Sequence, residues 1–186
     1  MLLDEKIALL SQRLLRLDTG ALSELRRMEV GGVGPLPYWA LASECGFLDD
    51  DAAAWMRIVH ILALLTPRGE LHAGDRLHDP ERRLGAALCD GGDPTWPPAG
   101  GDPRPIVSES RLARLLATPA SQRGEALTRL ARMLAARRDR GSGVNCKEIA
   151  ALLLFGDVER NLQQIAQAYY RRLDSAARKA EKEEVQ

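Results

Sequence analysis

The sequence predicts an all-α protein. Apolar residues recur at intervals of three and four positions, as Leu10, Leu14 and Leu17 illustrate near the N-terminus, and this spacing places them on one face of a helix. Leucine and alanine dominate the composition, whereas the β-branched residues typical of strands are sparse. A chain of 186 residues is long enough to bury one hydrophobic core or two small ones, so we expect a packed globular protein.

Helix-start signals divide the first part of the chain into five expected helices. Asp18 and Thr19 can cap the second helix, and prolines open the third. The run Asp49-Asp50-Asp51 favours the N-terminus of the fourth, because negative charge is stabilised there. The pattern of the fifth helix is weaker. The expected ranges are 3–17, 20–28, 35–45, 51–65 and 80–89.

The stretch from Asp90 to Pro105 is rich in glycine, proline and aspartate, a composition that cannot sustain a helix. We therefore expect an exposed linker or insertion that joins two small helical bundles. A polar, frayed tail is expected at the C-terminus. The predicted divisions are an N-terminal bundle over 1–90, a Gly/Pro-rich linker or insertion over 91–106, a C-terminal bundle over 107–180 and a tail over 181–186.

Four helices are expected after this linker. Ser108 can cap the first of them, and Asn145 with Glu148 forms a capping-box-like pair at the start of the third. Gly156 ends the third helix, and Asp157 can cap the last one. The expected ranges are 108–117, 121–138, 146–155 and 157–180.

Positive charge is concentrated in the C-terminal half. Residues 1–100 contain 10 Lys+Arg and 15 Asp+Glu, whereas residues 101–186 contain 16 and 11, although the formal net charge is zero. The arginines within 111–140 are Arg111, Arg114, Arg123, Arg129, Arg132, Arg137, Arg138 and Arg140. Arginine suits planar, bidentate contact with phosphate. Arginine enrichment is also typical of a GC-rich genome, so composition alone leaves both explanations open.

The second helix of the C-terminal half has a leucine face and an arginine face. At about 100° per residue, Arg129, Arg132 and Arg140 fall opposite its leucines. Arg111 and Arg114, three residues apart on the preceding helix, repeat the arrangement. Such arginine stripes neutralise phosphates without reading bases. The alternative is the ordinary solvated face of an amphipathic helix.

The sequence contains no arrangement of side chains with the spacing of a catalytic or cofactor site. We therefore expect a protein that is not an enzyme and that holds no metal or cofactor. His60 lies inside an apolar run and is expected to be a satisfied core histidine. His72 and His78 share a loop-like stretch with Asp75 and Asp79, and this group could bind a metal, but its spacing matches no known site.

Cysteine usage and hydropathy indicate a cytoplasmic protein without membrane contact. Cys45, Cys89 and Cys146 are an odd number without short spacing, so we expect buried, reduced thiols rather than disulfides or a zinc site. The N-terminus lacks the layout of a signal peptide, and the longest apolar run is far shorter than a membrane span.

Short motifs follow one another in a fixed order between about residues 10 and 175. They are Leu17-Asp18-Thr19-Gly20 followed by Leu25-Arg26-Arg27, then Arg111-Leu112 with Leu115-Leu116, Leu130-Ala131-Arg132-Met133-Leu134, the Gly143-Val144-Asn145 turn, Leu152-Leu153 and Tyr169-Tyr170. In this order and approximate spacing they resemble the small (CasB-type) subunit of the type I-E CRISPR Cascade surveillance complex. Cys146 stands where the family often has tryptophan, and the 90–105 segment resembles an insertion.

The resemblance implies a non-catalytic subunit that helps to hold the guide–target heteroduplex and the displaced DNA strand while the R-loop forms. The partners that it implies are the guide RNA, the target DNA, the displaced DNA strand, the Cascade backbone and large subunits, and a second copy of the chain. Arg27 and Arg132 match positions at which the family places DNA-contacting basic residues. Further candidates for nucleic-acid contact are Arg26, Arg57, Arg111, Arg114 and Arg129.

Two other classes of function stay open at this point. A helical scaffold that binds only neighbouring proteins would also be rich in leucine and alanine and poor in aromatic residues. A helix-turn-helix regulator could use 146–155 as its recognition helix, but this segment is too apolar for a major groove, where base-contacting side chains are needed.

Overall fold

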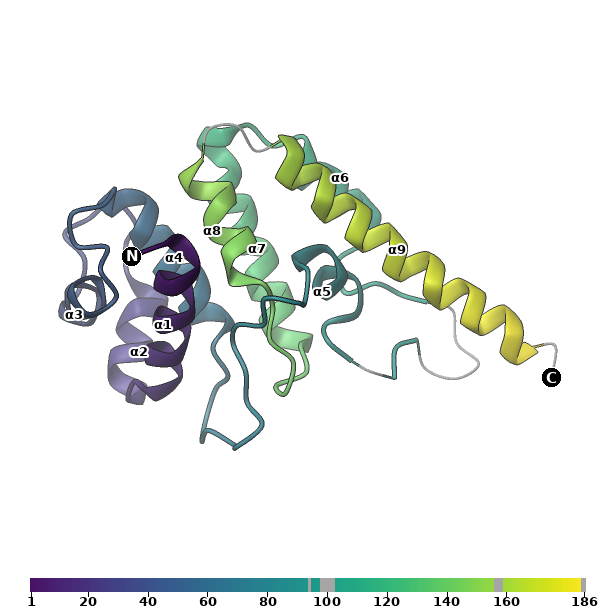
Figure 1. The fold of residues 1–186 in the computed structure, drawn as a ribbon, viewed down its shortest axis with the longest axis horizontal. Coiled ribbons are helices and arrows are strands. Elements are labelled where there is room, and N and C mark those ends of the chain that lie inside the picture. The colour runs from purple at the N-terminus through teal and green to yellow at the C-terminus, as the bar shows by residue number, and fades with distance from the viewer. Residues whose placement is uncertain (94, 98–102, 156–158, 185–186) are drawn as a thin grey trace.

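A computed structural model of the chain describes residues 1–93, 95–97, 103–155 and 159–184, and within these ranges the fold consists of nine α-helices (Figure 1). They are α1 (Leu3–Arg16), α2 (Thr19–Arg27), α3 (Leu36–Glu44), α4 (Ala52–Leu65), α5 (Leu84–Asp90), α6 (Glu109–Leu116), α7 (Ala120–Arg137), α8 (Cys146–Leu154) and α9 (Glu159–Glu184). The described residues contain no strand, only an isolated bridge between His78 and Val144. The prediction of an all-α protein is confirmed.

Most helices begin and end within two residues of their predicted limits, and α5 is the main exception. The sequence places its start near residue 80, whereas the helix begins at Leu84. A turn occupies the intervening residues, because Asp79 accepts hydrogen bonds from the N–H groups of Glu81 and Arg82.

The C-terminal helix is longer than predicted. α9 continues to Glu184, beyond the predicted end at 180, and the fraying expected over 181–186 stays a prediction. The stretch consists of glutamate and lysine after Ala180, and these residues have high helix propensity. The predicted helix end at Gly156 and the predicted cap Asp157 lie outside the described residues.

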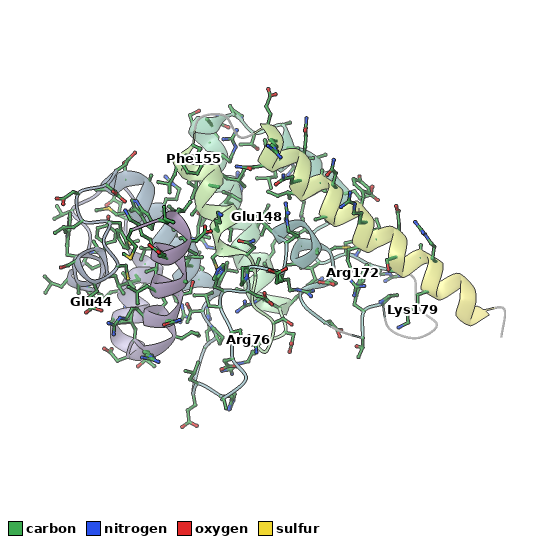
Figure 2. The ribbon with its side chains drawn as sticks, in the orientation of Figure 1. Glu44, Arg76, Glu148, Phe155, Arg172 and Lys179 are labelled. Atoms are coloured by element: carbon green, nitrogen blue, oxygen red, sulfur yellow. The ribbon has the colours of Figure 1, made fainter. Side chains whose placement is uncertain are left out.

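Four of the predicted caps can be compared with the structure. Asp18 caps α2, because its side chain accepts a hydrogen bond from the N–H of Ala21 at 2.9 Å. Asp51 accepts hydrogen bonds from two backbone N–H groups of α4, at 3.0 and 3.2 Å. Asn145 accepts one from the N–H of Glu148 at 3.3 Å, but the Glu148 carboxylate turns away and accepts from the N–H of Leu84 at 2.6 Å. Ser108 makes no capping hydrogen bond. Glu148 therefore joins α8 to α5 instead of completing a capping box (Figure 2).

α4 is the central helix of the fold. From Trp55 to Leu65 its residues are buried, with the exception of the half-buried Arg57. A helix that is apolar around its whole circumference has to be enclosed by other helices. α1, α2, α7 and α8 pack against it, and the contact with α7 is the most extensive.

Helices from both predicted bundles share one hydrophobic core. α4 belongs to the N-terminal half and packs against α7 and α8 from the C-terminal half. In the same way α5 lies along α9, as Figure 1 shows. The boundary predicted at 91–106 therefore coincides with no gap in the packing.

The segment predicted to be an exposed linker is an excursion that leaves the end of α5 and returns to it. Trp96 is only 7% exposed. The N–H groups of Ile106 and Val107 donate to the carbonyl oxygens of Cys89 and Leu88 at 2.9 Å each. The prediction of an exposed linker is thus wrong at Gly91, Gly92, Trp96 and Pro97, which are buried, whereas Thr95 and Arg104 are exposed. Composition indicates that the helix ends but not how the loop is anchored.

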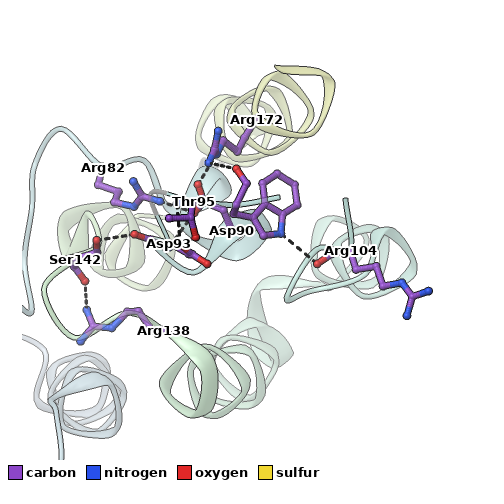
Figure 3. Close-up of polar contacts among 10 residues, drawn as sticks. Arg82, Asp90, Asp93, Thr95, Arg104, Arg138, Ser142 and Arg172 are labelled. Atoms are coloured by element: carbon purple, nitrogen blue, oxygen red, sulfur yellow. Dashed lines mark hydrogen bonds and ion pairs between the residues drawn. The ribbon is translucent and has the colours of Figure 1, made fainter. Parts of the chain in front are cut away.

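A buried carboxylate anchors this excursion (Figure 3). Asp90 is 2% exposed, and its two oxygens form ion pairs with Arg82 and Arg172. Gly92 N–H donates to the same carboxylate at 2.9 Å. Arg172 also lies over the ring of Trp96, 5.2 Å from its centroid, and donates to its carbonyl oxygen at 3.0 Å. Because an unpaired charge is costly when buried, these contacts hold α5, α9 and the excursion together.

α5 and α9 approach each other so closely that the contact requires a glycine. A Cβ atom at Gly85 would lie 2.0 Å from the carbonyl oxygen of Ile165 and 2.9 Å from the nitrogen of Tyr169, both in α9. Backbone atoms within a helix cannot swing aside as a side chain can. Any larger residue at this position would therefore push the two helices apart.

We expect Gly85→Ala to destabilise the fold by about 2 kcal/mol, because overpacking costs about 1–3 kcal/mol and exceeds the gain in helix propensity. The measurement is urea-induced unfolding followed by circular dichroism. Gly74→Ala is the matched control, since a Cβ at Gly74 would meet no atom within 4 Å. Equal stability of the two variants would contradict the close approach of α5 and α9.

Candidate nucleic-acid interface

Some arginines of this chain serve the fold, and Arg26 is one of them. Its guanidinium donates hydrogen bonds to the carbonyl oxygens of Ala63 at 2.8 Å and Thr66 at 2.7 Å, at the end of α4. Burial, followed by the positive charge of Arg68, lowers the pKa of Arg26. Arg26 therefore caps α4, a structural role that its sequence pattern does not indicate.

Arg140 also serves the fold. α7 ends at Arg137, so Arg140 does not continue its helical face, and the prediction that it lies beside Arg129 and Arg132 is wrong. Its guanidinium forms a bidentate pair with Asp75, at 3.1 Å and 2.5 Å. This pair holds the pKa of the nearly buried Asp75 carboxyl below its usual range. It fastens the loop between α4 and α5 to the end of α7.

Other predicted arginines lie along adjoining grooves of the surface. The central groove, of about 460 Å³, lies between α4 and α7 and is lined by Arg57, Arg129 and Arg132. A second groove, of about 110 Å³, lies between α6 and α7 and contains Arg111, Arg114 and Arg129. Arg129 lines both grooves, so the two adjoin at this side chain.

A third groove, of about 230 Å³, extends the central one in the other direction. It shares Arg132 with the central groove and adds Arg68, which follows the end of α4. Arg132 and Arg129 therefore connect a row of basic side chains that runs from the end of α4 to α6. We call this row the arginine track; it consists of Arg57, Arg68, Arg111, Arg114, Arg129 and Arg132.

The arginine track carries almost no compensating negative charge. Glu125 is the one acidic side chain among the residues that line the three grooves. Within the described ranges, none of the six guanidinium groups forms an ion pair or a side-chain hydrogen bond, whereas Arg82 and Arg172 are both paired with carboxylate. Unpaired guanidinium groups retain all their donors for a phosphate.

The position of Arg57 depends on a glycine in the middle of α7. A Cβ atom at Gly124 would lie 2.0 Å from Cδ and 2.5 Å from Nε of Arg57. The side chain of Arg57 thus lies against the bare backbone of α7 at this point. Glycine costs about 1 kcal/mol relative to alanine inside a helix, so it is an unfavourable residue here unless the contact requires it.

His60 lies in the same groove, one turn after Arg57 on α4. It is 6% exposed, and its Nδ1 is 3.1 Å from the carbonyl oxygen of Leu25. Burial is the main cause that lowers the pKa of His60. The Leu25 hydrogen bond opposes this effect, and the positive charges of Arg132 and Arg57 add to it.

Arg27 lies apart from the arginine track. It is exposed on α2 and lines a separate groove together with Glu24 and Glu29. Its Nε donates to the carbonyl oxygen of Ser23 at 3.3 Å. The structure therefore does not bring together Arg27 and Arg132, the two positions that the resemblance singles out.

Arg68 is a member of the track that sequence reasoning missed. It follows Thr66 and Pro67 beyond the end of α4, so it belongs to no helical face whose periodicity could reveal it. Its place beside Arg132 arises from the packing of α4 against α7. No local signal in the sequence indicates this neighbourhood.

The histidine and aspartate group that could bind a metal is occupied by structural contacts. Asp75 pairs with Arg140, and Nδ1 of His78 lies 3.1 Å from the N–H of Cys146, which donates to it. Across the described ranges, His, Cys, Asp and Glu side chains form no group of three or more that could hold a metal ion. The cysteines are free and buried, as predicted, and burial raises the pKa of Cys146 to about 12.

A membrane-spanning element is likewise not found. Among the helices that the structure describes, none combines the length and the apolar character needed to cross a bilayer.

In comparisons with known proteins, the chain matches no protein-family model and no curated protein. The resemblance to the Cascade small subunit is thus carried by the short motifs of the sequence alone.

We expect the gain in stability from Gly124→Ala to depend on the residue at position 57. Beside Arg57 the new methyl group should give little or no gain, because it has to displace the arginine side chain and this offsets the helix propensity of alanine. In an Arg57→Ala background the same change should stabilise the protein by up to about 1 kcal/mol, through helix propensity. Urea unfolding of wild type, Gly124→Ala, Arg57→Ala and the double variant gives the effect of Gly124→Ala in both backgrounds. Equal effects in the two backgrounds would exclude the contact between Arg57 and Gly124.

Proposed function

We propose that this chain is a non-catalytic subunit of a nucleic-acid-binding assembly and that the arginine track holds the phosphate backbone. The observation that carries the proposal is the row of six unpaired arginines along three adjoining grooves. A row of unpaired cations repels itself and gains stability when a polyanion lies along it. Phosphodiester strands are polyanions that guanidinium groups bind in bidentate geometry.

The side chains of the grooves favour contact with the backbone over contact with bases. No aromatic residue lines any of the three grooves, whereas the large aromatic side chains Tyr38, Trp55 and Tyr169 are buried in the core. Proteins that hold single strands by their bases use aromatic stacking platforms. Binding through arginine alone depends on salt and is largely independent of sequence.

The motifs of the sequence lead us to propose a specific assembly, the type I-E Cascade complex, with this chain as its small subunit. In that role the track would contact the target DNA or the displaced DNA strand while the R-loop forms. Its partners would be the guide RNA, the backbone and large subunits and a second copy of the chain. Backbone contact that is largely independent of sequence suits a complex in which guide pairing reads the sequence.

The two alternatives differ from this proposal in what they require of the surface. A scaffold that binds only proteins would pair these arginines with carboxylates of a partner, and it predicts no salt-dependent binding of DNA. A helix-turn-helix regulator would need α8 in a major groove. Ile149, Ala150 and Leu152 of α8 are buried against other helices, so this helix is not free to enter DNA.

We expect Arg129→Ala/Arg132→Ala to weaken the binding of single-stranded DNA and to leave the fold intact, because exposed substitutions change stability by only about 0.5 kcal/mol. The slope of log affinity against log salt should fall by roughly 0.7 for each phosphate that the variant no longer neutralises. Affinity for two unrelated oligonucleotide sequences should decrease equally. The measurement is fluorescence anisotropy at several salt concentrations.

The matched control for this experiment is Arg13→Ala/Arg16→Ala on α1. It removes the same charge at the same helical spacing, both residues are exposed, and neither lines the grooves of the track. The control should retain most of the affinity and of the salt slope. Arg27→Ala should also have a small effect, since Glu24 and Glu29 in its groove repel phosphate. If the Arg129→Ala/Arg132→Ala variant binds DNA as the control does, the result would favour the alternative of a scaffold that binds only proteins.

The proposed assembly has its own test. When the tagged chain is purified from its natural host, a short guide RNA with CRISPR repeat sequence and the Cascade backbone subunits should co-purify with it. RNA sequencing identifies the guide RNA, and mass spectrometry identifies the subunits. The tag alone is the control. Recovery of the chain without guide RNA would contradict membership of Cascade, and the salt dependence of oligonucleotide binding would still decide whether the chain binds DNA.

A further inference from the structure

His60 is only in part the satisfied core histidine that its apolar context predicts. A carbonyl oxygen can only accept, so the hydrogen bond to Leu25 places a proton on Nδ1 and leaves Nε2 without one in the neutral ring. Nε2 makes no hydrogen bond within the described residues, and it is not among their buried unpartnered atoms. Because the ring lines the central groove, Nε2 is the nitrogen left to face it.

The groups around this ring are mostly cationic. α4 contributes Arg57, and α7 contributes Arg129, Arg132 and Glu125. α2 contributes the Leu25 carbonyl. Arg26 of α2 is engaged with carbonyl oxygens one turn beyond His60 on α4, and Glu24 and Arg27 of α2 line a separate groove. α1 and α8, which also pack against α4, contribute no side chain to the described lining of the groove.

We propose that His60 is a phosphate ligand of the central groove, in which Nε2 takes up a proton as the anion binds and then donates a hydrogen bond to a phosphate oxygen. The proton comes from solvent, and no other bond forms or breaks. The inference rests on the proposed nucleic-acid contact for its natural ligand, a phosphodiester, and it extends that contact to a residue other than arginine.

The geometry allows this change without a rearrangement of the ring. Nδ1 donates to Leu25 in the neutral and in the charged form, so only Nε2 changes its role. Without an anion, burial and the charges of Arg132 and Arg57 disfavour the imidazolium and lower the pKa of His60. A phosphate between the arginines and the ring places a negative charge beside Nε2, which raises that pKa in the complex.

Proton uptake of this kind makes binding dependent on pH. His60 has a pKa below its ordinary value in the free protein and a higher one in the complex, so affinity is greatest below the lower pKa. Between the two values affinity falls by up to about tenfold per pH unit, and above the higher value it no longer changes. Arginine stays charged throughout this range and contributes no such dependence.

The first experiment measures the affinity of a thymidine oligonucleotide between about pH 5.5 and pH 8, where phosphodiester and thymine carry constant charge while histidine titrates. The affinity of wild-type protein should fall by up to about tenfold per pH unit as pH rises through this window. His60→Gln should give a flat profile, because glutamine cannot be protonated. His72→Gln, a change of an exposed histidine outside the groove, should retain the wild-type profile.

A second measurement uses wild-type protein only, so it does not depend on the folding of a variant. The sequence has three histidines, His60, His72 and His78, and NMR resolves their titrations individually. Sulfate, which does not titrate in this range, should raise the pKa of His60. A titration of His60 that neither sulfate nor the oligonucleotide alters would overturn the inference.

The two measurements separate the two proposals. If the oligonucleotide binds with the same pH profile in wild type and His60→Gln, the inference fails and the nucleic-acid contact stands. If no oligonucleotide binds but sulfate raises the pKa of His60, the nucleic-acid contact fails and the anion ligand stands. Inorganic sulfate thus decides the role of His60 even without DNA.

Discussion

α4 carries apolar side chains around its whole circumference, so each of its sides has to be covered by another helix. α1 and α2 cover it from the N-terminal half of the chain, and α7 and α8 cover it from the C-terminal half. This requirement brings the two halves into one core. The enclosure opens where Arg57 and His60 meet α7, and the central groove of the arginine track lies at that opening. The candidate interface is therefore a consequence of how α4 is buried.

Arginines in this protein have two separate roles. Some pair with groups inside the fold, and others have no partner among the described residues and face solvent. Arg82 and Arg172 neutralise the buried Asp90, and Arg26 caps the end of α4 through carbonyl oxygens. These side chains offer little to a ligand, because their guanidinium groups are held by partners within the fold. The members of the arginine track contact no carboxylate within the described part of the chain, so their charge is directed to solvent and to whatever anion enters the grooves.

Local features of the sequence predict the helices well, because spacing and caps such as Asp51 and Asn145 act within a few residues. The contacts that the sequence does not predict are those between residues far apart along the chain. The pairing of Arg140 with Asp75 and the neighbourhood of Arg68 and Arg132 join residues more than sixty positions apart. Likewise, the composition of the excursion after α5 indicates a loop, but the contact that buries Trp96 lies on α9. Five of the seven predicted arginines line the track, while Arg26 and Arg27 do not.

The excursion after α5 begins and ends on the same turn of that helix, since Ile106 and Val107 hydrogen-bond to Cys89 and Leu88. A loop with both ends fixed in this way can change in length at little cost, because doubling its length costs only about 0.6 kcal/mol of closure entropy. Insertions and deletions that keep the contacts of Asp90 and Trp96 would leave α6 and α7 in place. The segment can thus change in length during evolution without loss of the candidate nucleic-acid interface. Chain length is therefore a poor guide to shared function among proteins of this architecture. The spacing of arginines along α7 has no such freedom, because one residue more or fewer rotates the row by about 100°.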